Sequence, residues 1–423
     1  MGDDRSAMRA VVLHPDISGA RASRDPAAAL EEAVSLAAAL PGLEIVAAEI
    51  VRLPRAQPGT LFGSGKIEEL GRRFEAAEVG LVLVDGPVTP VQQRNLERAW
   101  KVKLLDRTGL ILEIFSDRAR TREGTLQVEM AALSYQRTRL VRAWTHLERQ
   151  RGGLGFVGGP GETQIEADRR AIDEALTRLR RQLAKVVRTR ELHRAARAKV
   201  PYLVVALVGY TNAGKSTLFN HLTGAEVLAK DMLFATLDPT MRAVALEGGA
   251  EVILSDTVGF ISDLPTELVA AFRATLEEVS AADLIVHVRD ISHPDTDEQA
   301  ADVAGVLASL GVEETTPQIE VWNKMDRVDP EVRAARLAEA ARKPGIVAVS
   351  ALTGEGVDAL VARIAEAVSE ARHASTVHLG FGDGRRRAWL YDEGVVTAET
   401  RGDSGLDLDV RWTERQKARF ARL

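Results

Sequence analysis

The stretch Gly209-Tyr210-Thr211-Asn212-Ala213-Gly214-Lys215-Ser216 constrains the fold of this chain more than any other. It follows the apolar run Leu203–Val208, which predicts a buried strand, and it precedes Thr217–Leu222, which predicts the start of a helix. In such a loop the backbone N–H groups point inward, and the helix N-terminus adds positive potential. An ordinary Gly-containing turn would not explain the final Lys-Ser pair, so we predict that all eight residues bind the phosphates of a nucleotide.

Two side chains of this loop have predicted roles of their own. Lys215 is expected to reach the β- and γ-phosphates as a catalytic group, and Ser216 is expected to hold Mg²⁺. Further along, an apolar strand ends in Asp256, which suits ligation of Mg²⁺ through water. The next residues, Thr257, Val258 and Gly259, are also predicted to contact the nucleotide. Gly259 is predicted to be a catalytic residue too, since its N–H group would approach the γ-phosphate and respond to its loss.

A segment between these motifs supplies candidate switch threonines. We choose Thr236 as the second Mg²⁺ ligand and as a catalytic residue, with Thr240 as the competing choice. The other residues of the segment that are predicted to contact the nucleotide are Phe234, Ala235, Leu237 and Asp238.

The base is predicted by Asn323-Lys324-Met325-Asp326, which follows an apolar strand pattern. The carboxylate of Asp326 can accept two hydrogen bonds from the N1–H and N2–H₂ edge of guanine, whereas adenine offers no such pair of donors. Asn323 would join this segment to the phosphate loop, and the stem of Lys324 would lie over the base. A later strand ends in Ser350, Ala351 and Leu352, which we expect to close over guanine.

These elements occur in the order phosphate, switch, Mg²⁺, base and base. That order predicts a P-loop GTPase that binds GTP and GDP with Mg²⁺ and hydrolyses GTP to GDP and phosphate. Many GTPases have Gln directly after Asp-x-x-Gly, where it orients the attacking water. This chain has Phe260 there, so we expect slow intrinsic hydrolysis that another residue or a partner must assist. Asn212 is compatible either with K⁺ bound beside the phosphates or with a bracing role in the loop.

The composition excludes several classes of protein. The chain has no cysteine, so disulfides and thiolate metal sites are ruled out. Its N-terminus begins Met1-Gly2-Asp3-Asp4-Arg5 and has no apolar signal core, and no stretch is long enough to span a membrane. We therefore expect a cytoplasmic protein without stable membrane insertion.

The net charge of −6 conceals an asymmetry along the chain. Residues 118–199 carry 19 Lys and Arg against 9 Asp and Glu, a local charge of +10. Aromatic residues make up only 4% of the chain, so electrostatic contact with the backbone of structured RNA fits better than base stacking. The alternative is a solvated helical face.

The same region predicts a helical hairpin. Two helical patterns, Leu110–Arg151 and Glu162–Lys199, flank a segment with six glycines in the ten residues 152–161. The second helix has an apolar seam at Ile172, Leu176, Leu179, Leu183 and Val186. The loop would then be the exposed tip of the hairpin and would probe RNA, unless it is only a flexible linker.

Four parts are expected along the chain: 1–115, 116–200, 201–372 and 373–423. The first alternates strand and helix patterns and predicts a small α/β domain with a parallel sheet. Its Gly63-Ser64-Gly65-Lys66 lacks the first glycine of a P-loop, and Ile67 replaces the hydroxyl that would bind Mg²⁺. We interpret it as a turn that opens a helix, with a second phosphate site as the alternative.

The fold class is therefore α/β. A P-loop GTPase domain with a mixed, mostly parallel sheet and helices on both faces follows the small α/β domain and its hairpin. A small α+β module completes the chain, with strands expected at Thr376–Leu379 and Arg387–Tyr391.

A further motif before the P-loop consists of Gly155, Gly158, Gly159, Pro160, Gly161, Glu162, Thr163, Gln164, Ile165, Glu166, Asp168, Arg169 and Arg170. This motif resembles the HflX family of bacterial GTPases. Leu61–Lys66 and Phe234–Thr240 are similar to segments of that family too, and the resemblance extends from about residue 8 to residue 372. The family normally carries an apolar residue at the position of Phe260.

The resemblance implies binding to the large ribosomal subunit and its rRNA through the basic hairpin 118–199. It also implies GTP-dependent splitting of 70S ribosomes, often under stress, with the hairpin loop reaching toward the peptidyl-transferase region. It supports Ser216 and Thr236 as Mg²⁺ ligands. Off the ribosome we expect a monomer. The competing hypotheses are an NTP-driven RNA remodeller with a second nucleotide site in the N-terminal domain, and a regulatory GTPase with a non-ribosomal effector.

Overall fold

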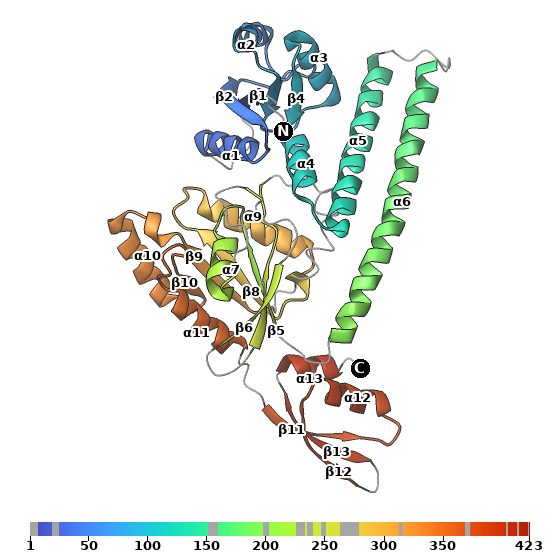
Figure 1. Cartoon of the computed structure of the whole chain (residues 1–423), viewed down its shortest axis with the longest axis vertical. Helices are drawn as coiled ribbons and strands as arrows, with labels where there is room; N and C mark the ends of the chain where they lie inside the picture. Colours follow the sequence, from blue (N-terminus) through green and yellow to red (C-terminus); the bar gives the residue numbers. More distant parts are fainter. Residues whose placement is uncertain are drawn as a thin grey trace, which may run out of the picture.

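The computed structural model describes residues 7–18, 25–150, 160–197, 203–225, 233–234, 240–246, 251–262, 279–312, 316–368, 373–402, 405–412, 414–421 and 423. Three separate sheets follow one another along the chain. A pair of long helices comes between the first two in the sequence and lies to one side of both in space (Figure 1). The structure is the mixed α/β protein that the alternating patterns predict. No helix within the described ranges is both long and apolar enough to cross a bilayer.

The first sheet has four parallel strands in the order β2-β1-β3-β4. Its elements are β1 (Met8–Ile17), α1 (Pro26–Ala38), β2 (Leu43–Leu53), α2 (Ser64–Ala76), β3 (Leu81–Val84), α3 (Pro90–Trp100) and β4 (Lys103–Asp106). One face packs against α2 and α3 around Phe62, Phe74 and Trp100. The other face packs with α1 and with the helix after β4, so apolar strands such as Leu81–Val84 are buried on both sides.

Three helices follow this sheet: α4 (Arg107–Arg118), α5 (Arg122–Gln150) and α6 (Pro160–Arg197). The prediction of one helix from Leu110 to Arg151 was wrong at residues 119–121. Ala119 is extended there, and the Thr121 hydroxyl accepts a hydrogen bond from Gly124 N at 3.0 Å as a new helix begins.

Helices α5 and α6 run side by side in opposite directions and form the predicted hairpin (Figure 1). In the apolar seam of α6, Leu176 and Leu179 are buried, and Ile172, Leu183 and Val186 are half-buried. The seam therefore faces α5, and the charged positions between its members face solvent.

The second sheet has six strands in the order β10-β9-β8-β5-β7-β6. Its strands are β5 (Leu203–Gly209), β6 (Thr240–Ala245), β7 (Glu251–Asp256), β8 (Leu284–Asp290), β9 (Gln318–Asn323) and β10 (Ile346–Ala348). Its helices are α7 (Lys215–Thr223), α9 (Thr296–Ser309), the short η1 (Met325–Arg327), α10 (Pro330–Arg342) and α11 (Val357–Val368). All strand pairs are parallel except β6 with β7. The carboxyl ends of β5, β7, β9 and β10 therefore meet at one edge of the sheet.

The third sheet is antiparallel, in the order β11-β13-β12. It comprises β11 (His373–Leu379), α12 (Gly384–Asp392), β12 (Val396–Arg401), β13 (Leu406–Trp412) and α13 (Glu414–Ala421). The strand predicted at Arg387–Tyr391 was wrong, because these residues belong to α12. At helical spacing Leu390 is fully buried while Arg387 stacks on exposed Tyr391, an arrangement that a strand would not produce.

Helix α4 joins the first two sheets. Its apolar residues Ile111, Ile114 and Phe115 belong to one buried cluster that also contains Val208 of β5 and Phe260. The first and second sheets therefore share a continuous core, with α4 between them (Figure 1).

Candidate functional site

The predicted phosphate loop connects β5 to α7, and two of its glycines are required by its geometry. Gly209 has φ +152°, and a Cβ atom there would lie 2.1 Å from the carbonyl oxygen of Val288. Gly214 has φ +95°, and its Cβ would lie 2.1 Å from Nδ2 of Asn323. Both positions need glycine because neighbouring groups approach the backbone closely. Asn212, with φ +59°, is in the left-handed region that Asn tolerates.

Lys215 is the first residue of α7 and is buried. Its Nζ donates hydrogen bonds to the carbonyl oxygens of Gly209 at 3.1 Å and Tyr210 at 2.8 Å. Burial lowers the pKa of its ammonium group to about 8. The loop thus wraps around this ammonium group, where a phosphate oxygen would receive a charge-assisted hydrogen bond.

The candidate magnesium ligands Ser216 and Asp256 lie together. Ser216 Oγ donates a hydrogen bond to Asp256 Oδ2 at 2.7 Å, and the carboxylate is buried at the end of β7. A hydroxyl and a carboxylate are hard oxygen donors, so the pair fits Mg²⁺ with several waters and phosphate oxygens retained.

Thr236, the predicted second magnesium ligand, lies outside the described residues, as do Ala235, Leu237 and Asp238. Thr240, the competing choice, begins β6 and pairs directly with Asp256 across the antiparallel ladder. Phe234, which belongs to the same predicted segment, is buried.

The residues after Asp256 lie against the phosphate loop. Thr257 Oγ1 donates to Leu207 O at 2.6 Å. A Cβ on Gly259 would lie 2.8 Å from Thr211 Cγ2 and 3.0 Å from Lys215 Nζ, which places the Gly259 backbone beside the expected phosphates. Val258 is buried behind it.

Phe260 is joined to the loop through its backbone. Its N–H donates to Gly209 O at 3.1 Å, and its carbonyl accepts from Thr211 N at 2.7 Å. The side chain is buried in the core shared with α4. It therefore serves packing, and it provides no polar group for an attacking water.

The predicted base segments also converge. Asn323 Nδ2 donates to Ala213 O at 2.8 Å, and its Oδ1 accepts from Ala351 N at 2.9 Å, so one buried amide joins three loops. Met325 is buried, and its N–H donates to Val349 O at 3.2 Å. These bonds align the ends of β9 and β10 with the phosphate loop.

The side chains expected at the base lie at this junction. Ser350 Oγ donates to Asp326 Oδ1 at 2.6 Å, which orients the carboxylate. Lys324 has φ +63°, and its Nζ pairs with Asp290 at 2.8 Å. Leu352 has an exposed fraction of 74%, so a large apolar side chain is available to cover a planar ring. The arrangement can bind a purine through its edge and its face.

Sequence reasoning missed a set of polar residues behind the loop. The Tyr210 hydroxyl contacts Glu32 and Ser262, and the Arg107 guanidinium contacts Glu32, Asp85 and the Ser262 carbonyl. No motif connects residues so far apart in the chain, and only the shared core with α4 brings them together.

Four family models match consecutive parts of the chain. They are described as GTP-binding GTPase N-terminal (residues 27–116), GTP-binding GTPase middle region (118–197), 50S ribosome-binding GTPase (204–324) and HflX C-terminal domain (335–423).

Curated relatives match most of the chain. A GTPase HflX of Magnetococcus marinus is 53% identical over 90% of this chain and 87% of its own length. A GTPase HflX of Escherichia coli is 45% identical over 84% and 83%, respectively. Among solved structures, a GTP-binding protein from Sulfolobus solfataricus in complex with GDP is 21% identical over 86% of this chain and 99% of its own, with a TM-score of 0.45.

Proposed function

The chain belongs to the HflX family of GTPases, and from this premise we propose that its GTP form binds the large ribosomal subunit and separates 70S ribosomes. Membership makes the chain a GTP-binding, GTP-hydrolysing P-loop protein. The ribosomal partner is our proposal, and it accords with the matching model described as a 50S ribosome-binding GTPase.

The observation that carries this proposal is the basic face of α6. Five cationic side chains between residues 178 and 188 are exposed on this helix: Arg178, Arg180, Arg181, Lys185 and Arg188. A row of cations on a long projecting hairpin suits the phosphate backbone of structured RNA. The glycine-rich segment 152–159 lies outside the described residues, so its proposed contact with rRNA rests on the sequence alone.

We further propose the following roles at the nucleotide. Lys215 stabilises charge on the β- and γ-phosphates, the Gly259 N–H contacts the γ-phosphate, and Asp326 accepts hydrogen bonds from guanine. Bound Mg²⁺ would neutralise developing charge between the phosphates, held by Ser216, by Thr236 or Thr240, and by Asp256 through water. A K⁺ ion beside Asn212 remains a proposal.

Phe260 suggests why the ribosome would matter. Because its apolar side chain is packed in the core, the residue after Gly259 cannot orient the attacking water. The ribosome would then supply or position the missing group. Hydrolysis would relax the switch segments and lower affinity for the ribosome.

We also propose that the chain divides into the parts 1–115, 116–200, 201–372 and 373–423. In this scheme the first part anchors the hairpin, the second contacts RNA, and the third switches with the nucleotide. The last part, the module with the β11-β13-β12 sheet, has no assigned role.

Ribosome splitting tests the proposal. Purified 70S particles mixed with the protein and a non-hydrolysable GTP analogue should separate into subunits on a sucrose gradient, whereas GDP should have little effect.

The triple variant Arg180→Gln/Arg181→Gln/Arg188→Gln should weaken binding to 50S subunits by about tenfold or more, and this deficit should shrink as salt rises. The matched control Arg72→Gln/Arg94→Gln/Arg98→Gln removes exposed cations from helices α2 and α3 and should bind normally. Equal loss in both variants, or no splitting by the unaltered protein, would count against the ribosomal reading.

A further inference from the structure

The start of α4 connects two polar networks that face different neighbours. Asp106 caps this helix, and its Oδ1 accepts a hydrogen bond from Gly109 N at 2.8 Å. The same carboxylate accepts from the Tyr135 hydroxyl at 2.6 and 2.7 Å and from Arg139 at 3.1 Å, both on α5. The middle of α5 is therefore tied to the residue that caps α4.

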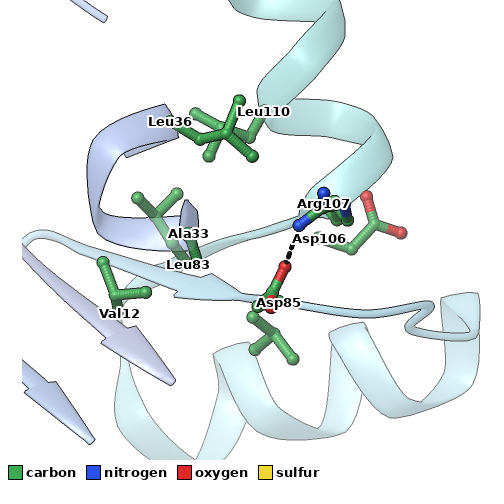
Figure 2. Close-up of a pocket in the computed structure, with 9 residues that line it drawn as sticks. Val12, Ala33, Leu36, Leu83, Asp85, Asp106, Arg107 and Leu110 are labelled. Atoms are coloured by element: carbon green, nitrogen blue, oxygen red, sulfur yellow. Dashed lines mark hydrogen bonds and ion pairs between the residues drawn. The ribbon is translucent and has the colours of Figure 1, made fainter. Parts of the chain in front are cut away.

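The next residue, Arg107, faces the nucleotide-binding unit. Its guanidinium donates to Asp85 at 2.6 Å, to Glu32, and to the carbonyl oxygen of Ser262 at 3.2 Å. Figure 2 shows Arg107 and Asp106 side by side at the start of the helix, beside the bonded Asp85. Burial alone would lower the pKa of Arg107, but Glu32 and Asp85 raise it, so the buried cation stays charged.

Glu32 carries this network into the phosphate loop. The Tyr210 hydroxyl donates to Glu32 Oε2 at 2.5 Å and accepts from Ser262 N at 2.9 Å. Tyr210 directly follows Gly209, and Ser262 comes three residues after Gly259. The same hydroxyl thus joins the loop expected to hold phosphate to the segment expected to detect it.

The C-terminal end of α4 contacts Phe234, which belongs to the segment with the candidate switch threonines. The rings of Phe115 and Phe234 meet edge to face, with centroids 4.6 Å apart at 82°. Arg118 also donates to Phe234 O at 3.4 Å and to Ala39 O at 2.9 Å. Phe234 has φ +56° and precedes the predicted magnesium ligand Thr236, so a change at α4 bears directly on that segment.

We propose that α4 couples the hairpin to the nucleotide site, with Arg107, Tyr210 and Phe115 as positioning residues for the two segments that contact the γ-phosphate and Mg²⁺. Asp106 and Tyr135 form the hairpin end of the same connection. For its physiological trigger the inference rests on the proposed ribosome contact. The connection itself is a property of the free protein.

Two physical arguments support this coupling. A buried polar network has discrete arrangements, because each unpaired member is costly, and a shift at one end therefore favours a rearrangement at the other. Coupling between two sites is also reciprocal, so if hairpin contact alters the nucleotide site, the bound nucleotide must alter α5 around Tyr135. The second consequence can be measured without a ribosome.

Single hydroxyl deletions test the connection with little disturbance of packing. Tyr210→Phe removes the contact with Glu32 and Ser262, and Tyr135→Phe removes the contact with Asp106. Glu32→Gln offers a second way to weaken the centre of the network if Tyr210→Phe folds poorly. Tyr391→Phe is a matched control, because its hydroxyl donates to Glu399 at 2.7 Å in the C-terminal module, remote from α4 along the chain.

The experiment is hydrogen–deuterium exchange of the full chain, saturated with GDP or with a non-hydrolysable GTP analogue. In the unaltered protein, amides of α5 around Tyr135 should exchange at rates that differ severalfold between the two nucleotides. Tyr210→Phe, or Glu32→Gln, should remove most of that difference when each nucleotide is kept at a saturating concentration. Tyr391→Phe should retain it. Identical exchange in both nucleotide states of the unaltered protein would overturn the inference, and so would an undiminished difference in Tyr210→Phe and Glu32→Gln.

A ribosomal measurement separates this inference from the proposed function. If 50S subunits stimulate GTP turnover, Tyr135→Phe should keep the basal kcat and KM and lose most of the stimulation. Combining it with Tyr210→Phe should cause no further loss of stimulation, because both act on one connection. Normal stimulation of Tyr135→Phe would overturn the coupling alone. Absence of stimulation in the unaltered protein would overturn the ribosomal trigger, and the exchange experiment would still decide the coupling.

Discussion

Two loops of this protein present a lysine at the start of a helix, and their surroundings differ. Lys215 at the start of α7 is buried and bonds to the carbonyl oxygens of its own loop. Lys66 in the first turn of α2 pairs instead with Glu49 at 2.6 Å and Glu69 at 2.8 Å. Burial lowers the pKa of Lys215 to about 8, whereas hydrogen bonds from Lys66 to Glu49 and Glu69 raise the pKa of Lys66.

The backbones of the two loops differ in the same sense. Gly214 has a positive φ and lies against Asn323. Gly63 has φ −71°, and a Cβ added there would have no atom within 4 Å. The comparison teaches that Gly-Lys at a helix start does not by itself make a phosphate site. A loop that wraps around the lysine is needed as well, with the ammonium group bonded to the carbonyl oxygens of that loop rather than to carboxylates. The geometry around Lys66 favours the interpretation as a turn that opens a helix.

Removing each lysine should give the largest contrast. Lys215→Ala should lower GTP turnover by about 10³-fold, because a preorganised cation is lost from the transition state. Lys66→Ala should leave turnover within about twofold, since its charge is already paired on the surface. Steady-state GTPase and ATPase assays of both variants measure this. ATP turnover that survives Lys215→Ala and disappears in Lys66→Ala would revive the second nucleotide site.

Changing the carboxylate that is proposed to bind the base should give the next largest effect. Asp326→Asn replaces an acceptor pair by an amide that matches xanthine better than guanine. The preference for GTP over XTP should fall by about 10²-fold, because the two hydrogen bonds from guanine to a charged carboxylate are lost. Competition of XTP and GTP against a fluorescent guanine nucleotide measures this ratio. An unchanged preference would show that the base is recognised elsewhere.

A glycine pair provides a smaller contrast. Gly214→Ala should weaken nucleotide binding by about tenfold or more, since its Cβ would meet Asn323 at 2.1 Å and φ is +95°. Gly65→Ala, with nothing within 4 Å, should leave nucleotide binding unchanged and stabilise α2 by about 0.5–1 kcal/mol. Calorimetric titration with GDP and thermal unfolding measure the two effects. Equal affinities in both variants would contradict the requirement for a wrapped loop.

The smallest expected effect concerns the monovalent cation. If Asn212 helps to bind K⁺, replacing Na⁺ by K⁺ at constant ionic strength should raise the basal rate severalfold, and Asn212→Ala should abolish the difference. Equal rates in the two salts would leave Asn212 with the loop-bracing role that its φ of +59° suits.

The sequence predicted the local features of this protein and missed the long-range ones. The P-loop, Asp256 and Asn323 stand in short motifs with strong apolar flanks, so their strands and loops could be predicted. The break at residues 119–121 depends on one hydroxyl cap, and α12 depends on burial of Leu390 under a sheet. The network of Arg107, Glu32 and Tyr210 could not be predicted, because it exists only once two sheets share a core.

We propose that the nucleotide site of Lys215 hydrolyses GTP rapidly only when the ribosome completes it. The direct measurement is GTP turnover by the full chain with and without purified 50S subunits. We expect a low basal rate and at least about tenfold stimulation, by analogy with GTPases whose missing group is supplied in trans. Equal rates with and without 50S subunits would contradict it.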